Sequence, residues 1–161
     1  MEHTEAGEYD LRTRVMMRSH LERCLQDIWG TRDLAVDDDR DYPYPYGIAA
    51  CWVSPLGGPV PGVEVYAHAA VGLKPSARLL REVGELNARS RWTKLTFADG
   101  IVRVSATLHW AAVDRLALAH TLAQVGEVAN DVGSLLAVVY GGSTPFSADV
   151  PVRGSRSDEA A

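Results

Sequence analysis

The sequence predicts an α+β fold, in which an antiparallel sheet of two hairpins carries helices on one face. Segments 79–87 and 114–140 repeat apolar residues at the three- and four-residue spacing of amphipathic helices. A further helical pattern lies near the start of the chain, at residues 10–29. Short strand-like runs come in two pairs, 47–53 with 63–71 and 92–97 with 101–110. The predicted element order is therefore α-β-β-α-β-β-α.

The hairpin around Asp99-Gly100 is the most sharply predicted element of this fold. An Asp-Gly pair between two alternating runs favours a type I′ turn, because both central residues of that turn need positive φ. A two-residue loop also sets the register of the two strands. Apolar pairs then share one side, and the other side carries Trp92/Thr107, Lys94/Ser105, Thr96/Arg103 and Ala98/Ile101. We expect the first side to be packed and the second to be partly exposed to solvent.

Turn and capping residues place the elements before this hairpin. We expect helix 10–29 to end at Gly30, in the position that glycine favours after a helix. Residues 42–46, Tyr-Pro-Tyr-Pro-Tyr, are expected to be an extended entry to the sheet, because a residue before proline avoids the α region. The breaker-rich stretch 55–62 predicts a wide turn between the first two strands. Pro75 then lies near the first turn of the second helix, where its missing N–H costs nothing.

The last helix is predicted to begin after an N-cap at Asp114 and to end at Gly141. Its apolar stripe is continuous over about six turns and comprises Leu118, Leu122, Val125, Ala129, Val132, Leu136 and Val139. Gly126 and Gly133 interrupt this helix at a cost of about 1 kcal/mol each relative to alanine. They mark either a close approach to the sheet or a bend.

Composition and charge exclude several classes of protein. The 161 residues fit one domain, which we place at 10–142, with a mobile N-terminal arm at 1–9 and a mobile C-terminal tail at 143–161. A net charge of −5 argues against a nucleic-acid partner. Without a signal peptide or an apolar run of ~18 residues, we expect a cytoplasmic protein with no membrane partner. The two cysteines are expected to be buried, reduced thiols.

Catalytic and metal-binding motifs do not stand out, so we expect a protein that is not an enzyme and has no cofactor, metal or catalytic residue. Asp37, Asp39 and Asp41 have the spacing of calcium-loop ligands, but the loop lacks the glycine and glutamate of an EF-hand. A solvated charge run is the better interpretation. One enzymatic alternative would use His68 and His109, if both lie on the sheet face away from the helices.

Large side chains on the open side of the predicted sheet are the remaining functional candidates. The candidate peptide-binding residues are Tyr66, His68, Trp92, Ile101 and Arg103. An exposed apolar patch of this kind marks a binding site. The alternative is that the stretch 42–46 or the C-terminal tail covers it.

The second half of the chain resembles the YbjN family and the type III secretion chaperone-like (TY-Chap) fold. The resemblance lies in residues 80–87, which end in Leu-Asn, in the hairpin 94–108, and in the last helix at Leu122, Val125 and 129–131. It implies a helix-and-sheet domain that binds an extended or unfolded segment of a client protein without a cofactor. No catalytic residue is carried over.

Two functional hypotheses follow from these observations. The first is a non-catalytic peptide- or protein-binding module, similar to a secretion chaperone, that holds a client segment on its sheet face or edge. The alternative is a structural or regulatory interaction subunit that pairs through its long C-terminal helix, 114–140. A homodimer is compatible with either.

Overall fold

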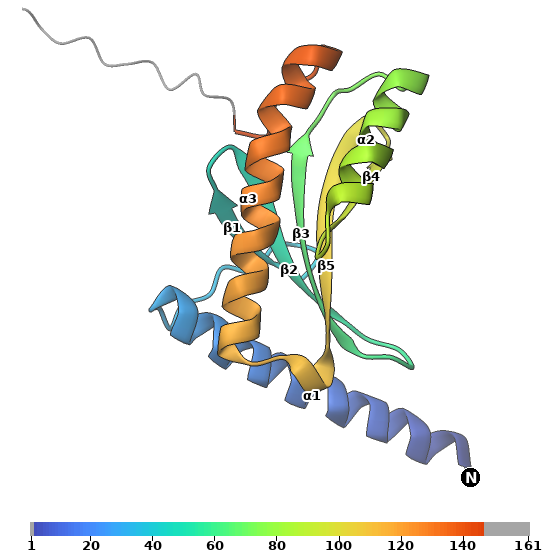
Figure 1. The fold of residues 1–161 in the computed structure, drawn as a ribbon. Coiled ribbons are helices and arrows are strands. Elements are labelled where there is room, and N and C mark those ends of the chain that lie inside the picture. The colour runs from blue at the N-terminus through green and yellow to red at the C-terminus, as the bar shows by residue number, and fades with distance from the viewer. Residues whose placement is uncertain (1, 147–161) are drawn as a thin grey trace, which may run out of the picture.

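The computed structural model describes residues 2–146, with side chains from residue 11 onward. Three helices and a five-stranded antiparallel sheet of order β1-β2-β3-β5-β4 make up the domain (Figure 1). The elements along the chain are α1 (Glu2–Trp29), β1 (Tyr42–Tyr46), β2 (Ala49–Leu56), β3 (Gly62–Ala70), α2 (Ala77–Arg89), β4 (Lys94–Ala98), β5 (Ile101–His109), the 3₁₀ turn η1 (Trp110–Ala112) and α3 (Arg115–Tyr140). The predicted α+β class is confirmed.

One strand was missing from the predicted order. Residues 42–46, expected as an extended entry, form β1 and pair with β2 from Tyr42/Val53 to Tyr46/Ala49. The observed order is α-β-β-β-α-β-β-α, so a three-stranded meander replaces the first predicted hairpin. Proline lacks an N–H and is confined to edge strands, and β1 is an edge strand of the sheet. Its two prolines are therefore compatible with a strand that pairs on one side alone.

The Asp-Gly hairpin has the predicted register from Lys94 onward, but the expected pair Trp92/Thr107 is absent because β4 begins at Lys94. β4 pairs with β5 as Lys94/Ser105, Leu95/Val104, Thr96/Arg103, Phe97/Val102 and Ala98/Ile101. Both turn residues, Asp99 and Gly100, have positive φ, as a type I′ turn requires. The pairing of β3 with β5 joins this hairpin to the meander in one sheet.

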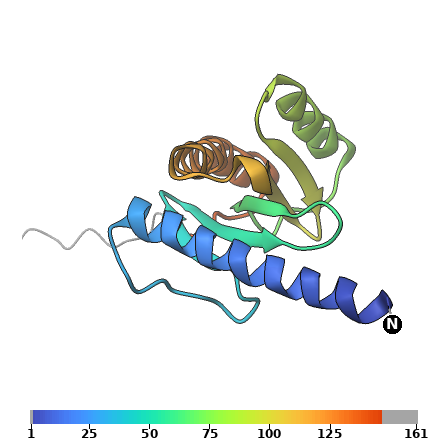
Figure 2. The ribbon, with the colours of Figure 1, turned by 90° about the horizontal axis from the view of Figure 1, so that it is seen from below.

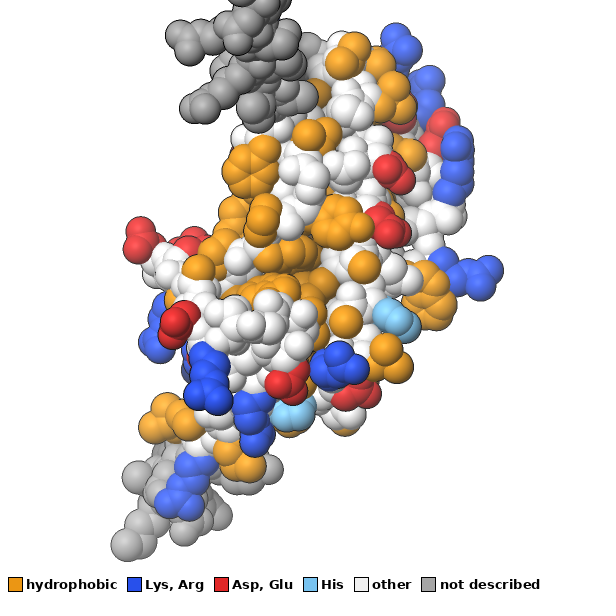
Figure 3. All heavy atoms as spheres, turned by 90° about the vertical axis from the view of Figure 1, so that its left-hand side faces the viewer, with side chains coloured by type: hydrophobic (Ala, Val, Ile, Leu, Met, Phe, Trp, Pro, Cys, Tyr) orange, Lys and Arg blue, Asp and Glu red, His pale blue; other side chains and the backbone are white. Residues whose placement is uncertain are grey.

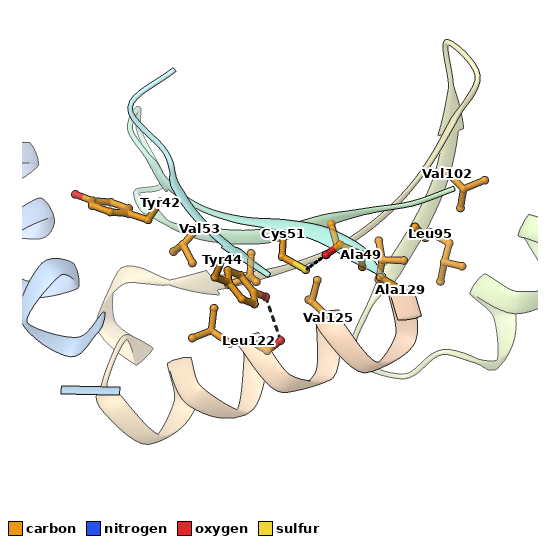
Figure 4. Packing of buried hydrophobic residues seen from close by; sticks show 14 of the residues in the cluster. Tyr42, Tyr44, Ala49, Cys51, Val53, Leu95, Val102, Leu122, Val125 and Ala129 are labelled. Carbon is orange, nitrogen blue, oxygen red and sulfur yellow. Dashed lines mark hydrogen bonds between the residues drawn. The ribbon is translucent and has the colours of Figure 1, made fainter. Parts of the chain in front are cut away.

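All three helices contact the same face of the sheet. Tyr42 and Tyr44, which point to this face from β1, reach α1 and α3: the Tyr42 hydroxyl donates to Glu22, and the Tyr44 hydroxyl to the carbonyl oxygen of Leu122. On the opposite edge, Asn87 of α2 accepts a hydrogen bond from the amide of Leu95 in β4. Figure 4 shows the buried side chains between the sheet and α3, and Figure 2 shows how α1 crosses one end of the domain.

Helix α3 has the caps that its sequence predicts. The Asp114 side chain accepts from the amide of Ala117, and Gly141 ends the helix in the left-handed conformation. Gly126 packs against the Tyr46 ring, and Gly133 packs against the backbone of Ala69. The two glycines therefore mark close approach to the sheet. By length and composition, α3 is also the one helix among the described residues that is apolar enough to cross a membrane, but it packs here along β3.

The chain ends fall partly within the described range. α1 begins at Glu2, so helix extends through residues that were expected to be a mobile arm, while their mobility stays a prediction. At the other end, Ser143 pairs with Val71, and the Phe146 amide donates to the Ile48 carbonyl. Most of the predicted tail, from residue 147, lies outside the described residues.

Candidate functional site

The sheet face away from the helices carries two rows of side chains that cross all five strands. Strand registers align the first row as Pro43, Trp52, Tyr66, Ser105 and Lys94, from β1 to β4. The second row, one step along the strands, is Pro45, Ala50, His68, Arg103 and Thr96. We call these two rows, with the residues that flank them, the open face. No helix within residues 2–146 covers it, because the helices pack on the opposite side.

Three aromatic rings form the centre of the open face. The ring centroids of Trp52 and Tyr66 are 5.3 Å apart with nearly parallel planes, and those of Trp52 and His68 are 4.8 Å apart. All three side chains are half-buried. Adjacent strands bring them together, because Trp52 is the register partner of Tyr66, and His68 follows Tyr66 on the same side of β3. The result is a rigid, largely apolar platform with polar ring edges.

Arg103 lies beside the Tyr66 ring, on the β5 side of this platform. Its guanidinium carbon lies 4.0 Å from the centroid of the Tyr66 ring, a cation–π contact. Its Nη2 donates to Glu64 on β3 at 2.9 Å. Its Nε is buried and has no hydrogen-bond partner among the described residues. Tyr66 and Glu64 therefore determine where Arg103 lies, while part of its hydrogen-bonding capacity is unused.

Asp41, the residue just before β1, binds the hydroxyl group of Tyr66. The Tyr66 hydroxyl donates to Asp41 Oδ2 at 2.8 Å. Burial, together with this hydrogen bond to a carboxylate, raises the pKa of Tyr66, so the phenol stays protonated at neutral pH. Asp41 is itself buried, so the expectation of a fully solvated Asp37–Asp41 run is wrong at its last residue.

His68 is kept neutral by its surroundings. Its pKa is lowered by burial and, to a smaller extent, by the positive charge of Arg103. A neutral imidazole that lies tilted beside the Trp52 ring behaves as an additional aromatic surface. The three rings at the centre of the open face are therefore uncharged at neutral pH, and the charged groups beside them are Asp41 and the paired Arg103 and Glu64.

A polar hollow of about 450 Å³ lies at the β4 end of the open face. Arg91, Trp92 and Lys94 border it on one side, and Arg103 and Glu64 on the other. Trp92 leaves 69% of its surface exposed, the most of any Trp, Tyr or Phe side chain among the described residues. Arg91 and Lys94 are exposed as well. This end of the open face therefore has an exposed indole and two exposed cations, although the protein has a net negative charge.

An apolar hollow of about 360 Å³ lies at the opposite, β1 end. No charged side chain lines it, and its walls are Pro43, Tyr44, Pro45, Ala50, Cys51, Trp52 and Phe146. Figure 3 views the molecule from the side on which β1 lies and shows hydrophobic side chains gathered along the middle of that side. The stretch 42–46 is thus a strand that builds this hollow, so it does not cover the patch.

The structure brings four of the five candidate residues to one connected surface. Tyr66, His68 and Arg103 surround the centre of the open face, and Trp92 borders the same hollow as Arg103. Ile101 lies on the same side of β5, two residues from Arg103, beside the Asp-Gly turn and outside both hollows. Whether these residues bind a peptide stays a prediction.

Sequence reasoning missed Trp52 as a site residue. The run 47–53 shows little alternation, so the side of the sheet to which Trp52 points was undefined. The long Pro- and Gly-rich loop between β2 and β3 also leaves their register open. The aromatic neighbours Tyr66 and His68 were the available signal, since a tryptophan on the adjacent strand often pairs with such rings.

The enzymatic alternative does not match the geometry. His68 and His109 lie at opposite ends of the paired strands β3 and β5. His68 is the register partner of Arg103, and His109 is that of Gly62. Six residues of strand separate Arg103 from His109, which is about 20 Å. His109 instead caps η1 by accepting from the amide of Ala111. Among the described residues, no group of three or more metal-ligating side chains is present.

Comparison with known proteins identifies the family. The model of TY-Chap1, described as the T3SS (YopN, CesT) and YbjN peptide-binding chaperone 1 family, matches residues 16–148. The chain belongs to this family. The TY-Chap1 match runs from within α1 to beyond Phe146, so it contains both hollows and the whole open face. The resemblance inferred from residues 80–131 is therefore confirmed, and the family is one of peptide-binding chaperones.

A solved structure has the same fold as this chain. The chain is similar to one in the crystal structure of the ExsC–ExsE complex, with a TM-score of 0.54 and 17% sequence identity. The alignment covers 73% of this TY-Chap1 chain and 94% of that one. At this identity the likeness establishes the fold. No curated protein sequence matches the chain.

Proposed function

We propose that this TY-Chap1 chain is a non-catalytic chaperone-like module that holds an extended segment of a client protein on the open face of its sheet. The observation that carries the proposal is the pair of side-chain rows that cross the sheet without a helix over them. The aromatic centre supplies apolar contact area, and the two hollows supply recesses for client side chains. Both cysteines are free and buried, which fits a protein that acts in the reducing environment of the cytoplasm.

The face is a better client site than either edge of the sheet. Strand addition needs a row of unpaired N–H and C=O groups. On the β1 edge, Pro43 and Pro45 have no N–H to offer. On the β4 edge, the outward amide of Leu95 already donates to Asn87 of α2. Both edges therefore carry the protections that natural sheets use against added strands, which supports client binding on the face.

Selection of peptides from a random display library by the full-length protein tests this function. A photo-crosslinking residue in place of Thr96, which is exposed on the open face, should form adducts with the selected peptides. The same residue in place of Val138, exposed on α3, is the matched control and should not. Trp52→Ala and Trp92→Ala should weaken binding about tenfold each while the circular dichroism spectrum is unchanged. Adducts at residue 138 alone would reject the proposal.

The outer side of α3 favours one second candidate function, pairing with another protein chain or with a second copy. Leu116, Leu135 and Val138 are large apolar side chains that this helix leaves exposed. Sedimentation across a range of concentrations, with Val138→Asp as the disrupting variant, tests this pairing. A monomer at all concentrations, with no stable complex, would remove it.

A further inference from the structure

The two ends of the open face differ in chemistry, although they belong to the same two rows. At the β1 end the hollow beside Trp52 has no charged lining residue. At the β4 end the hollow has three cations, Arg91, Lys94 and Arg103, and one carboxylate, Glu64. A surface that is apolar at one end and cationic at the other binds one orientation of an amphipathic ligand better than the other.

The positive charge at the β4 end is available to a ligand. Arg103 is neutralised by its ion pair with Glu64. Arg91 and Lys94 form no ion pair with any described residue, and both are exposed. The hollow therefore keeps two cations without an ion pair to a described residue, with Glu127 in the recess next to Arg91, whereas the chain as a whole has a net charge of −5. A local excess of the opposite sign to the net charge indicates a preference for an acidic partner.

We infer that the client segment binds in one polarity, with bulky apolar side chains in the hollow beside Trp52 and carboxylates over Arg91 and Lys94. This inference rests on the proposed function and names the chemistry of its ligand: an acidic, amphipathic peptide of another protein. The exposed indole of Trp92, between the two cations, contacts the apolar part of the acidic residues or a neighbouring side chain of the client.

The geometry of the rows sets the spacing within such a client. Trp52 and Lys94 stand in the same row, three strand intervals apart along β2, β3, β5 and β4. Strands lie about 4.8 Å apart, so the two ends are separated by about 14 Å. An extended chain advances about 3.3 Å per residue, so about four residues separate the apolar and acidic groups. Tyr66 and Ser105 lie under the linking residues.

A charge-reversal experiment tests the polarity. Peptides selected from a random display library by the full-length protein should be enriched in Asp and Glu about four residues from a bulky apolar residue. Arg91→Glu combined with Lys94→Glu should reduce their affinity about tenfold and abolish the acidic enrichment. The control is Lys74→Glu combined with Arg81→Glu, which makes the same charge change at exposed positions away from both hollows. It should leave affinity within about twofold.

The outcomes separate this inference from the function on which it rests. Peptides that bind through Trp52 but show no acidic preference would overturn the polarity and leave the proposed function standing. Equal loss in the control double variant would overturn it too, because the preference would then come from net charge. A protein that selects no peptide, and whose mass in solution halves on charge reversal, uses the face to bind a second copy; both proposals then fail.

Discussion

Gly133 of α3 lies directly against the carbonyl oxygen of Ala69 in β3, so close that a side chain at this position would overlap with the strand backbone. The contact lets the helix approach the centre of the sheet, where the small, buried side chains of Ala67 and Ala69 leave room for it. The obstructing atom belongs to the backbone of β3 and is not the end of a flexible side chain, so it has little freedom to move. The glycine that looks unfavourable in a helix is required by packing.

Replacing Gly133 with alanine should therefore destabilise the protein. Helix propensity alone would stabilise it by about 1 kcal/mol, but overpacking against rigid backbone costs about 1–3 kcal/mol. We expect a net loss of up to about 2 kcal/mol in the free energy of unfolding, measured by urea denaturation. Gly84→Ala is the control, because Gly84 in α2 has open space around it and should gain about 0.5–1 kcal/mol. Stabilisation at both positions would contradict the close approach.

Asn130 should be important for the turn between β1 and β2. Its Oδ1 accepts a hydrogen bond of 3.0 Å from the amide of Ile48, next to Gly47 at positive φ. Asn130→Ala leaves that partly buried donor without its acceptor, at a cost of about 1–2 kcal/mol. Asn130→Asp keeps an acceptor and should retain more of the stability. Hydrogen exchange should be faster at the Ile48 amide in the alanine variant, and equal exchange in both variants would count against this role.

Stability should fall in mild acid because of His68. Burial and Arg103 lower the pKa of this histidine in the folded state below its ordinary value near 6.5. The unfolded chain therefore takes up a proton first as the pH falls below about 6.5, which favours unfolding. We expect urea denaturation midpoints to decrease from pH 7 to pH 5, and less steeply in His68→Gln. Parallel pH profiles for the two proteins would show that another group is responsible.

The two cysteines should be unreactive in the native protein. Burial raises the pKa of Cys51 to about 11 and also raises that of Cys24. At pH 8 about one Cys51 side chain in a thousand would then be the reactive thiolate. We expect iodoacetamide to label neither thiol in the folded protein and both in urea, measured by mass spectrometry. Rapid native labelling of Cys51 would show that β1 and β2 separate readily.

Local interactions explain which parts of this fold can be derived from sequence. The register of β4 with β5 depends on the two-residue Asp99-Gly100 turn, so it is determined by neighbours in the chain. The N-cap Asp114 and the C-terminal Gly141 likewise act within one turn of the helix they end. For the same reason, Arg103 was assigned to the exposed side of β5 by alternation alone.

Long-range contacts explain what sequence reasoning missed. Proline-rich β1 is a strand because β2 and the helices bury its tyrosines, which outweighs the weak strand preference of Tyr-Pro repeats. Trp52 joins Tyr66 and His68 because β2 and β3 pair across a loop too long to set their register.

By itself, the sequence determined the α+β class, the Asp-Gly hairpin, the capped last helix and the side of the sheet on which Tyr66 and Arg103 lie. These features depend on residues close together in the chain. Only the tertiary structure decided that five strands form one sheet, that Asp41 is buried against Tyr66, and that an apolar and a cationic hollow occupy opposite ends of one face. Those features depend on which distant segments pack together, because burial of apolar surface is non-directional.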